Sequence, residues 1–233
     1  MYADVFCKVY NELGWNYYPE AFGEELLVWL KQQGRSPENA LDLGCGTGVL
    51  CRLLKSAGIR ASGMDLSSGM IDIARESDPE GKYAVADMVT YRPEDTFDLV
   101  TCTGDALNHI PSLSDVGLIF DHVYECLRPG GCFVFDILNG KEGSSDEPFE
   151  IDFDETLRVW FRMTRPGEDQ VNLNIRGYEN GVQTFEENIR ETIHDPELLC
   201  RMLQESGFNL LRCANTLTEG GNPGSTWYLI AEK

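Results

Sequence analysis

The segment Ala40-Leu41-Asp42-Leu43-Gly44-Cys45-Gly46-Thr47-Gly48 decides the fold of this chain, because an apolar, strand-like run leads directly into three alternating glycines. Glycine reaches positive φ without penalty and has no side chain to hold a ligand away. A glycine-rich turn after a strand therefore predicts a nucleotide-like cofactor. Dinucleotide-binding folds use the spacing G-x-G-x-x-G, whereas the sixth position of this turn is Val49. The spacing therefore weakens a pyrophosphate-binding interpretation.

Acidic residues end the next two strand-like segments. The first, Ala61–Met64, leads to Asp65, which lies about 20 residues beyond the glycine turn. Nucleotide-binding α/β folds place an acid at this distance because a carboxylate accepts two hydrogen bonds from the ribose diol. The second segment, Tyr83–Ala86, leads to Asp87 and Met88.

Two more segments follow in the expected order. Residues 97–102 are predicted to form a fourth strand, and Leu127-Arg128-Pro129-Gly130-Gly131 a turn into a fifth strand that ends at Asp136. With Asp42 two residues before the first glycine, the pattern resembles that of the class I S-adenosylmethionine-dependent methyltransferases of the small-molecule type. The resemblance implies an α/β fold, a doubly wound Rossmann-like seven-stranded sheet of order 3-2-1-4-5-7-6 whose last strand is antiparallel.

The same resemblance implies S-adenosylmethionine as the cofactor. In the family, the glycine turn passes beneath the methionine part, and the acid after strand three accepts from the adenine amine. The residues that the resemblance and the ribose argument assign to cofactor binding are Asp42, Gly44, Cys45, Gly46, Gly48, Asp65, Leu66, Asp87, Met88, Thr103 and Tyr10. Any one of the aspartates in this set could, taken alone, instead be a helix N-cap or a turn residue. Four segments in the right order favour the cofactor site.

The composition suits one acidic catalytic domain with an insertion. The chain has 233 residues, which is long enough to bury a large core. Its eight cysteines are scattered without a C-x-x-C pair, so we expect reduced thiols and no metal site. No apolar run is long enough to span a bilayer, and no basic region precedes an apolar run at the N-terminus, so we expect a cytoplasmic location and no membrane association.

The formal charge of −20 disfavours nucleic acid as the substrate. Lys and Arg supply most of the non-specific affinity for phosphate backbones, and no basic patch is visible that could overcome this charge. A small-molecule methyl acceptor is therefore expected, with O or N methylation favoured over C.

The order of predicted elements divides the chain into a core and an insertion. Strands alternate with helices from residue 38 to residue 137, which indicates a parallel sheet with crossover helices. The predicted helices are Glu20–Gln33, Gly48–Ala57, Ser67–Glu76, Asp115–Cys126 and Pro196–Glu205, and Phe208–Cys213 and Thr226–Ala231 are the last two strands. We expect residues 1–138 and 195–233 to form the methyltransferase core.

Residues 139–194 are expected to form an inserted antiparallel β lid. A polar loop precedes three predicted strands between Phe149 and Thr192, which are separated by turns at residues 166–169 and 179–181. The lid could cover the acceptor or form a homodimer. At the other side, Tyr2, Phe6 and Tyr10 recur at helical spacing, so the aromatic N-terminal segment either packs on the sheet edge or folds over the cofactor.

The segment after strand four, Gly104-Asp105-Ala106-Leu107-Asn108-His109, holds the candidate catalytic residues. It is similar to segments of small-molecule methyltransferases that lie near the transferred methyl group, which points to His109, Asp105 and Asn108. A histidine can take a proton near neutral pH, but it could equally cap a helix. Asn139 and Lys141 could also face the substrate.

Two other functions remain open on the sequence alone. One is a nicotinamide-dependent oxidoreductase, which Val49 and the lack of an obvious Tyr-Lys catalytic pair disfavour. The other is a regulatory protein that binds S-adenosylmethionine without catalysis, because the motifs indicate cofactor binding better than turnover.

Overall fold

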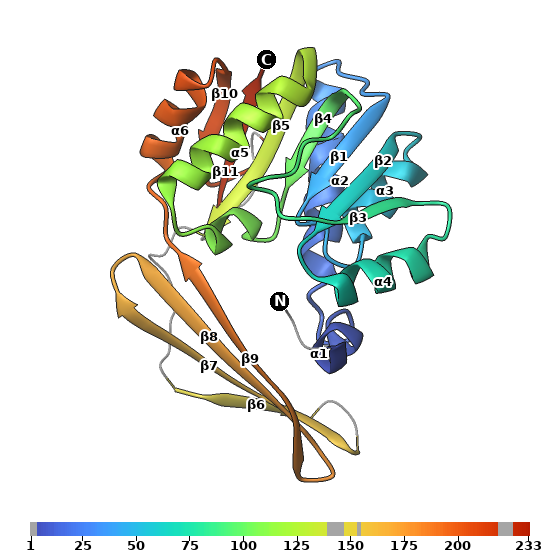
Figure 1. Cartoon of the computed structure of the whole chain (residues 1–233), viewed down its shortest axis with the longest axis vertical. Helices are drawn as coiled ribbons and strands as arrows, with labels where there is room; N and C mark the ends of the chain where they lie inside the picture. The colour runs from blue at the N-terminus through green and yellow to red at the C-terminus, as the bar shows by residue number, and fades with distance from the viewer. Residues whose placement is uncertain (1–3, 139–146, 153–154, 219–225) are drawn as a thin grey trace.

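A seven-stranded sheet forms the centre of the molecule in this computed structural model, which describes residues 4–138, 147–152, 155–218 and 226–233 (Figure 1). Its order is β10-β11-β5-β4-β1-β2-β3, and β11 runs antiparallel to both of its neighbours. The strands are β1 (Asn39–Leu43), β2 (Arg60–Asp65), β3 (Lys82–Val85), β4 (Phe97–Cys102), β5 (Leu127–Leu138), β10 (Asn209–Ala214) and β11 (Thr226–Glu232). The predicted strand order and the antiparallel last strand are confirmed.

Helices cover both faces of this sheet. The helices are α2 (Tyr17–Gln32), α3 (Val49–Ser56), α4 (Ser68–Ser77), α5 (Leu113–Cys126) and α6 (Pro196–Glu205), with a short 3-10 helix η1 (Ala106–His109) after β4. Buried side chains of α2, α3 and α4 pack on one face, and those of α5 and α6 pack on the other. Both faces of the parallel strands are thus buried, as expected for a doubly wound sheet.

Local chemistry explains where several helices begin. The Ser67 hydroxyl accepts from the backbone N–H of Met70 at the start of α4, at 3.4 Å. Asp195 caps α6 in the same way, and Pro196 occupies its first turn, where a missing N–H costs no helical hydrogen bond. Helix α2 begins three residues before the predicted Glu20, because Pro19 is tolerated in a first turn.

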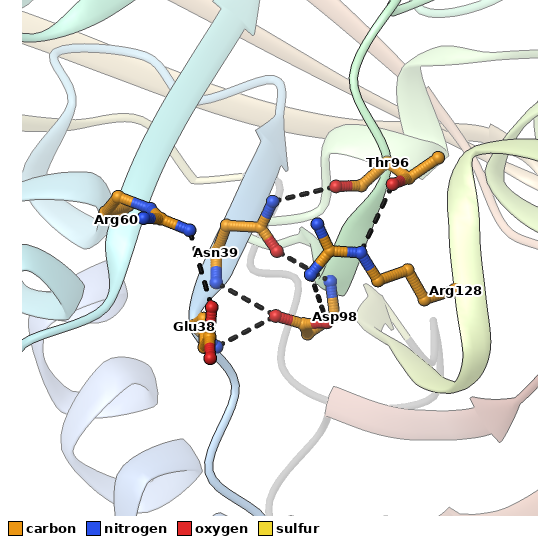
Figure 2. Close-up of polar contacts among 6 residues, drawn as sticks. All are labelled: Glu38, Asn39, Arg60, Thr96, Asp98 and Arg128. Carbon is orange, nitrogen blue, oxygen red and sulfur yellow. Dashed lines mark hydrogen bonds and ion pairs between the residues drawn. The ribbon is translucent and has the colours of Figure 1, made fainter.

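A cluster of polar residues joins the amino ends of the central strands, at the end of the sheet opposite the glycine turn. Figure 2 shows Asp98 accepting hydrogen bonds from the backbone N–H groups of Glu38 and Asn39, at 2.9 and 3.1 Å. Arg128 donates to the other oxygen of Asp98 at 3.0 Å, which ties β5 to β4 and β1. These contacts fix the amino ends of the strands relative to one another, and the carboxyl ends remain for a ligand.

The inserted strands form a separate antiparallel sheet of order β6-β7-β8-β9. They are β6 (Phe149–Asp152), β7 (Leu157–Gly167), β8 (Gln170–Glu179) and β9 (Val182–Thr192). The sequence interpretation of three strands was wrong, because it missed a break before Leu157 and merged β6 with β7. The turns at residues 168–169 and 180–181 lie inside the predicted turns. Figure 1 shows this sheet extending away from the carboxyl ends of the central strands.

The N-terminal helix α1 (Asp4–Val9) packs against the inserted sheet and not only against the core. Phe6 is buried and its ring lies 5.7 Å from the ring of Phe185 on β9. The helix ends at Val9, so Tyr10 follows it and does not lie on it as the spacing of Tyr2, Phe6 and Tyr10 predicts; Tyr2 lies outside the described residues. The rings of Phe6 and Tyr10 still meet edge to face at 5.9 Å.

The predicted turn Leu127–Gly131 forms the irregular beginning of β5. Phe97 pairs with Leu127 but Leu99 pairs with Cys132, so the residues between them bulge out of the ladder. Within the described part of the chain, no helix is long and apolar enough to cross a membrane.

Candidate active site

The glycine turn after β1 brings backbone close to η1 and leaves open space above itself. Gly44 has a φ of +69°, and a Cβ placed there would lie 2.8 Å from the Cβ of Ala106. Gly46 has a φ of +51°, and a Cβ placed there would have no neighbouring atom within 4 Å, so it faces open space. Gly48 forms the N-cap of α3, close to the hydroxyl of Tyr83. The turn thus has room for a ligand above Gly46.

Asp65, at the end of β2, lies beside this turn. One of its carboxylate oxygens accepts from the N–H of Gly46 at 2.9 Å, and the other accepts from the N–H of Ser67 at 2.8 Å. Burial raises the pKa of Asp65, and these backbone hydrogen bonds oppose the increase. Each oxygen keeps a further lone pair for a ligand. Leu66 follows with an apolar side chain that is 54% exposed, which suits the face of a base or sugar.

Asp87 and Met88 occupy the turn after β3. The Asp87 carboxylate accepts from the N–H of Val89 at 2.9 Å, so it shapes its own turn. It is also exposed, which leaves its outer oxygen accessible. Met88 extends toward the glycine turn, with its terminal carbon 3.5 Å from the position of a Cβ on Gly44. The structure therefore brings these two residues to the same edge as Asp65.

Asp42 lies beneath the turn and is almost completely buried. Thr101 donates to one of its oxygens at 2.7 Å, whereas the other oxygen has no hydrogen-bond partner in the described structure. Burial raises the pKa of Asp42 to about 7. Cys45 packs in the turn against Gly63 of β2, where a Cβ would approach its sulfur to 2.6 Å.

The loop after β4 is organised by Asp136, a buried residue of β5. Its carboxylate accepts from the hydroxyl of Thr103 at 2.6 Å and from the N–H groups of Gly104 and Asp105 at 3.0 and 2.9 Å. Burial raises the pKa of Asp136, and the bond from Thr103 opposes this. The sequence places Asp136 at a strand end, but only the folded sheet shows that it holds the neighbouring loop.

Asp105 itself adopts a φ of +58°, which is uncommon for a residue other than glycine. Burial, together with the neighbouring carboxylates of Asp136 and Glu191, raises its pKa well above the ordinary value. Glu191 belongs to β9 of the inserted sheet, and burial raises its pKa as well. Sequence reasoning missed Glu191, because no local motif connects it with the loop after β4.

Asn108 joins three parts of the molecule. Its amide nitrogen donates to the carbonyl of Thr192 on β9 at 2.8 Å, and its amide oxygen accepts from the N–H of Leu138 on β5 at 3.0 Å. Because backbone groups engage both ends of this buried amide, Asn108 holds η1, β5 and β9 together.

His109 lies at the same junction. Part of its surface is open to solvent. Partial desolvation lowers its pKa, whereas a backbone hydrogen bond to Arg190 and the charge of Asp65 oppose the decrease. The ring is therefore largely neutral near pH 7, a state in which it can accept a proton.

The N-terminal segment closes over the glycine turn and the loop after β2. Thr47 donates to the side-chain oxygen of Asn11 at 2.8 Å, and the sulfur of Cys7 lies 3.7 Å from the hydroxyl of Ser67. Burial and the nearby Asp65 and Asp105 raise the pKa of Tyr10 to about 12. Asn11, Cys7 and Ser67 were not predicted as site residues, since their positions depend on packing between distant segments.

Two further sequence candidates cannot be placed. Asn139 and Lys141 lie outside the described residues. Among the described residues, His, Cys, Asp and Glu side chains form no group of three or more that could hold a metal ion.

The segment that contains the glycine turn and the carboxyl ends of β1 to β4 is similar to a known protein family. Its residues 40–131 match the family model described as a methyltransferase domain. A protein of Geobacillus sp. (strain WCH70) that is named as a methyltransferase is 27% identical over 202 residues, which cover 82% of each chain.

Solved structures share the arrangement of the whole chain. The structure of an S-adenosylmethionine-dependent methyltransferase from Clostridium acetobutylicum ATCC 824 has a TM-score of 0.78 and 21% identity, and covers 90% of this chain and 89% of its own. CalS10, an amino pentose methyltransferase from Micromonospora echinaspora, has a TM-score of 0.75 and 19% identity, with 100% and 98% covered. Likeness at this identity shows the shared fold.

The chain thus has the α/β fold of the S-adenosylmethionine-dependent methyltransferases, and its residues 40–131 match a methyltransferase domain.

Proposed function

We propose that this enzyme transfers the methyl group of S-adenosylmethionine to a small-molecule acceptor. The acceptor would lie between the N-terminal segment, the loop after β4 and the inserted sheet. The observation that carries the proposal is the hydrogen bond from Asn108 to Thr192, which joins the loop beside the cofactor site to β9 at 2.8 Å. Such a boundary encloses a metabolite more readily than a polymer, and the charge of −20 disfavours nucleic acid.

The residues at the strand ends fit S-adenosylmethionine. Asp65 has lone pairs for the ribose diol, and the space above Gly46 leaves room for the methionine part. The exposed Leu66 and the partly buried Met88 offer apolar surface to the adenine, beside the accessible Asp87. When bound, the cofactor supplies an electrophilic methyl group on a sulfonium.

The remaining predicted cofactor residues surround this site and fix its loops. We propose that Asp42 and Cys45 position the turn, as the contacts of Asp42 with Thr101 and of Cys45 with Gly63 support. Thr103 would position the loop after β4 through Asp136, and Tyr10 would close the site from above.

This chain contributes positioning and proton transfer, because displacement at a sulfonium needs an aligned nucleophile and a base only for a bound proton. We propose that Asp105 and His109 face the acceptor and that Asn108 positions them. The raised pKa of Asp105 moves its carboxyl group toward the range in which proton transfer occurs near neutral pH, and the lowered pKa of His109 keeps its ring neutral and able to accept a proton.

We further propose that residues 139–194 act as a lid on a core made of residues 1–138 and 195–233. The packing of Phe6 and Cys7 with buried residues of β7, β8 and β9 supports a lid that closes against the N-terminal segment. A cytoplasmic location is part of the proposal, because eight cysteines, six of them buried, suit a reducing compartment.

The outer face of the inserted sheet supports a homodimer as part of the proposal. Trp160, Arg162, Asn172, Arg176 and Arg190 are among the residues that line a hollow of about 690 Å³ there. The buried side-chain oxygen of Asn172 has no partner among the described residues. Light scattering should give twice the monomer mass for the native enzyme and the monomer mass for Arg162→Glu, and a native monomer would contradict this proposal.

Transfer of a tritium-labelled methyl group into a metabolite extract tests the proposed function. We expect a labelled product that has gained the mass of one methyl group, and its loss when S-adenosylhomocysteine is added in excess. Cofactor binding without transfer to any metabolite would favour the regulatory alternative. Robust methylation of tRNA or DNA would refute a small-molecule acceptor.

A further inference from the structure

Two acidic residues, Asp105 in the loop after β4 and Glu191 on β9 of the inserted sheet, meet at the proposed acceptor side of the site. Asp105 precedes η1, and its carbonyl accepts from the N–H of Asn108 at 2.9 Å. The side chain of Asn108 then binds the carbonyl of Thr192, the residue after Glu191. These two bonds bring Asp105 and Glu191 to one junction between the core and the inserted sheet.

A second bond fixes the same junction. The ring nitrogen Nε2 of His194 lies 3.0 Å from the carbonyl oxygen of Ile110, so the segment after β9 is held to the end of η1. The two residues are thus placed by the fold, since two bonds join η1 to the end of β9 directly after Glu191.

The surroundings of the two carboxylates are acidic and aromatic. Asp105 is close enough to Asp136 and Glu191 for both to raise its pKa, and no Lys or Arg contributes to the shift. Burial is the cause of the raised pKa of Glu191. Both groups are therefore short of a cationic partner within the described chain.

Two tyrosines mark the position of the carboxylates relative to the cofactor loops. Tyr10 is influenced by Asp65 of the cofactor site and by Asp105 and Glu191, so it lies between the two regions. The hydroxyl of Tyr18 on α2 is buried beside Asp136 and Tyr228, so tyrosine hydroxyls border the acidic groups on this side as well.

We propose that the methyl acceptor is an amine that is protonated in solution, and that Asp105 and Glu191 bind its ammonium group and take up its proton. This inference rests on the proposed function and names its acceptor class. Anionic acceptors would be repelled by the two carboxylates, and a neutral alcohol would leave them without a counter-charge.

The proton and electron balance is simple. The ammonium group gives one proton to the carboxylate of Glu191 or Asp105, which frees the nitrogen lone pair. That pair forms the new N–C bond as the S–C bond of the sulfonium breaks, and the bond electrons stay on sulfur. The product is a methylated ammonium ion and S-adenosylhomocysteine, and the carboxylic acid releases its proton to solvent.

Matched amines and alcohols test the acceptor class. The probes are a panel of primary and secondary amines, each paired with the alcohol of the same carbon skeleton, with cyclohexylamine and cyclohexanol as one pair. Binding is measured by thermal shift with S-adenosylhomocysteine present, and reaction by tritium transfer. We expect saturable binding and methylation of at least one amine, at a rate at least tenfold above that of its alcohol.

Variants then test the two carboxylates. Glu191→Gln and Asp105→Asn should each lower the rate with the best amine at least tenfold and leave affinity for S-adenosylhomocysteine within about threefold. The matched control is Glu187→Gln, on the same face of β9 but four residues farther from Asn108, and it should keep the amine rate within twofold.

The outcomes separate this inference from the function on which it rests. If the native enzyme binds S-adenosylhomocysteine but prefers an alcohol, or neither binds nor methylates any amine of the panel, the amine assignment is overturned. Full activity of a folded Glu191→Gln, Asp105→Asn double variant overturns the role of the carboxylates. A native enzyme that fails to bind S-adenosylhomocysteine refutes the proposed function itself.

Discussion

Replacement of Asp65 by alanine should remove most of the affinity for the cofactor. Each carboxylate oxygen already accepts one backbone hydrogen bond, from Gly46 or Ser67, and retains one lone pair for a ribose hydroxyl. Hydrogen bonds to a charged acceptor contribute about 1.5–3 kcal/mol each, and two of them that are not fully additive give about 2–4 kcal/mol. This corresponds to a loss of about 30- to 700-fold in affinity.

Calorimetric titration with S-adenosylhomocysteine measures this loss directly. The control is Asp72→Ala on α4, whose side chain is 69% exposed, and it should bind within about twofold of the native enzyme. Circular dichroism and thermal unfolding must show that Asp65→Ala is folded, because Gly46 and Ser67 lose their acceptor. A folded Asp65→Ala variant with native affinity would remove Asp65 from the cofactor site.

Three further predictions concern buried polar groups. Asp42 keeps its proton in the folded state up to about pH 7 but loses it near pH 4 when unfolded, so its contribution lowers the free energy of unfolding as pH rises through this window, by on the order of 4 kcal/mol. Urea unfolding should show a flatter profile for Asp42→Asn, and an unchanged slope would contradict the raised pKa. Asn108→Ala leaves the carbonyl of Thr192 and the N–H of Leu138 without their partner, so urea unfolding should show a loss of about 2–4 kcal/mol, with methyl transfer falling more than cofactor affinity. Equal losses of transfer and affinity would count against its role on the acceptor side. Asp136→Ala removes the acceptor of three hydrogen bonds in the loop after β4 and should cost at least about 2 kcal/mol in the same assay, whereas a gain in stability would show that burial of its charge outweighs them.

Local patterns were sufficient to predict the central sheet. Alternation of apolar strands with capped helices fixes the crossovers, and helix Pro196–Glu205 begins and ends at its predicted residues because Asp195, Pro196 and Gly207 are strong local signals. The glycine turn and the acids at the strand ends were found because parallel strands bring their carboxyl ends to one edge. Their binding roles stay predictions until a ligand is measured.

The acceptor side could not be predicted in the same way. Glu191 and Asp136 approach Asp105 only when the inserted sheet and β5 are in place, and no sequence spacing encodes those contacts. The short strand β6 was missed because apolar residues recur at the odd positions from 149 to 163 with only Glu155 between them, which hides the break between two antiparallel partners. Tyr10 was predicted on a helix that ends at Val9, since periodicity locates helix ends poorly.

Calorimetric titration of the native enzyme with S-adenosylmethionine, S-adenosylhomocysteine and NAD tests the central claim most directly. The turn G-x-G-x-G and Asp65 are suited to a nucleoside without a pyrophosphate, so we expect saturable binding of the first two ligands, with one site per chain, and no binding of NAD. Tight binding of NAD without heat from S-adenosylmethionine would contradict the cofactor assignment and the function derived from it.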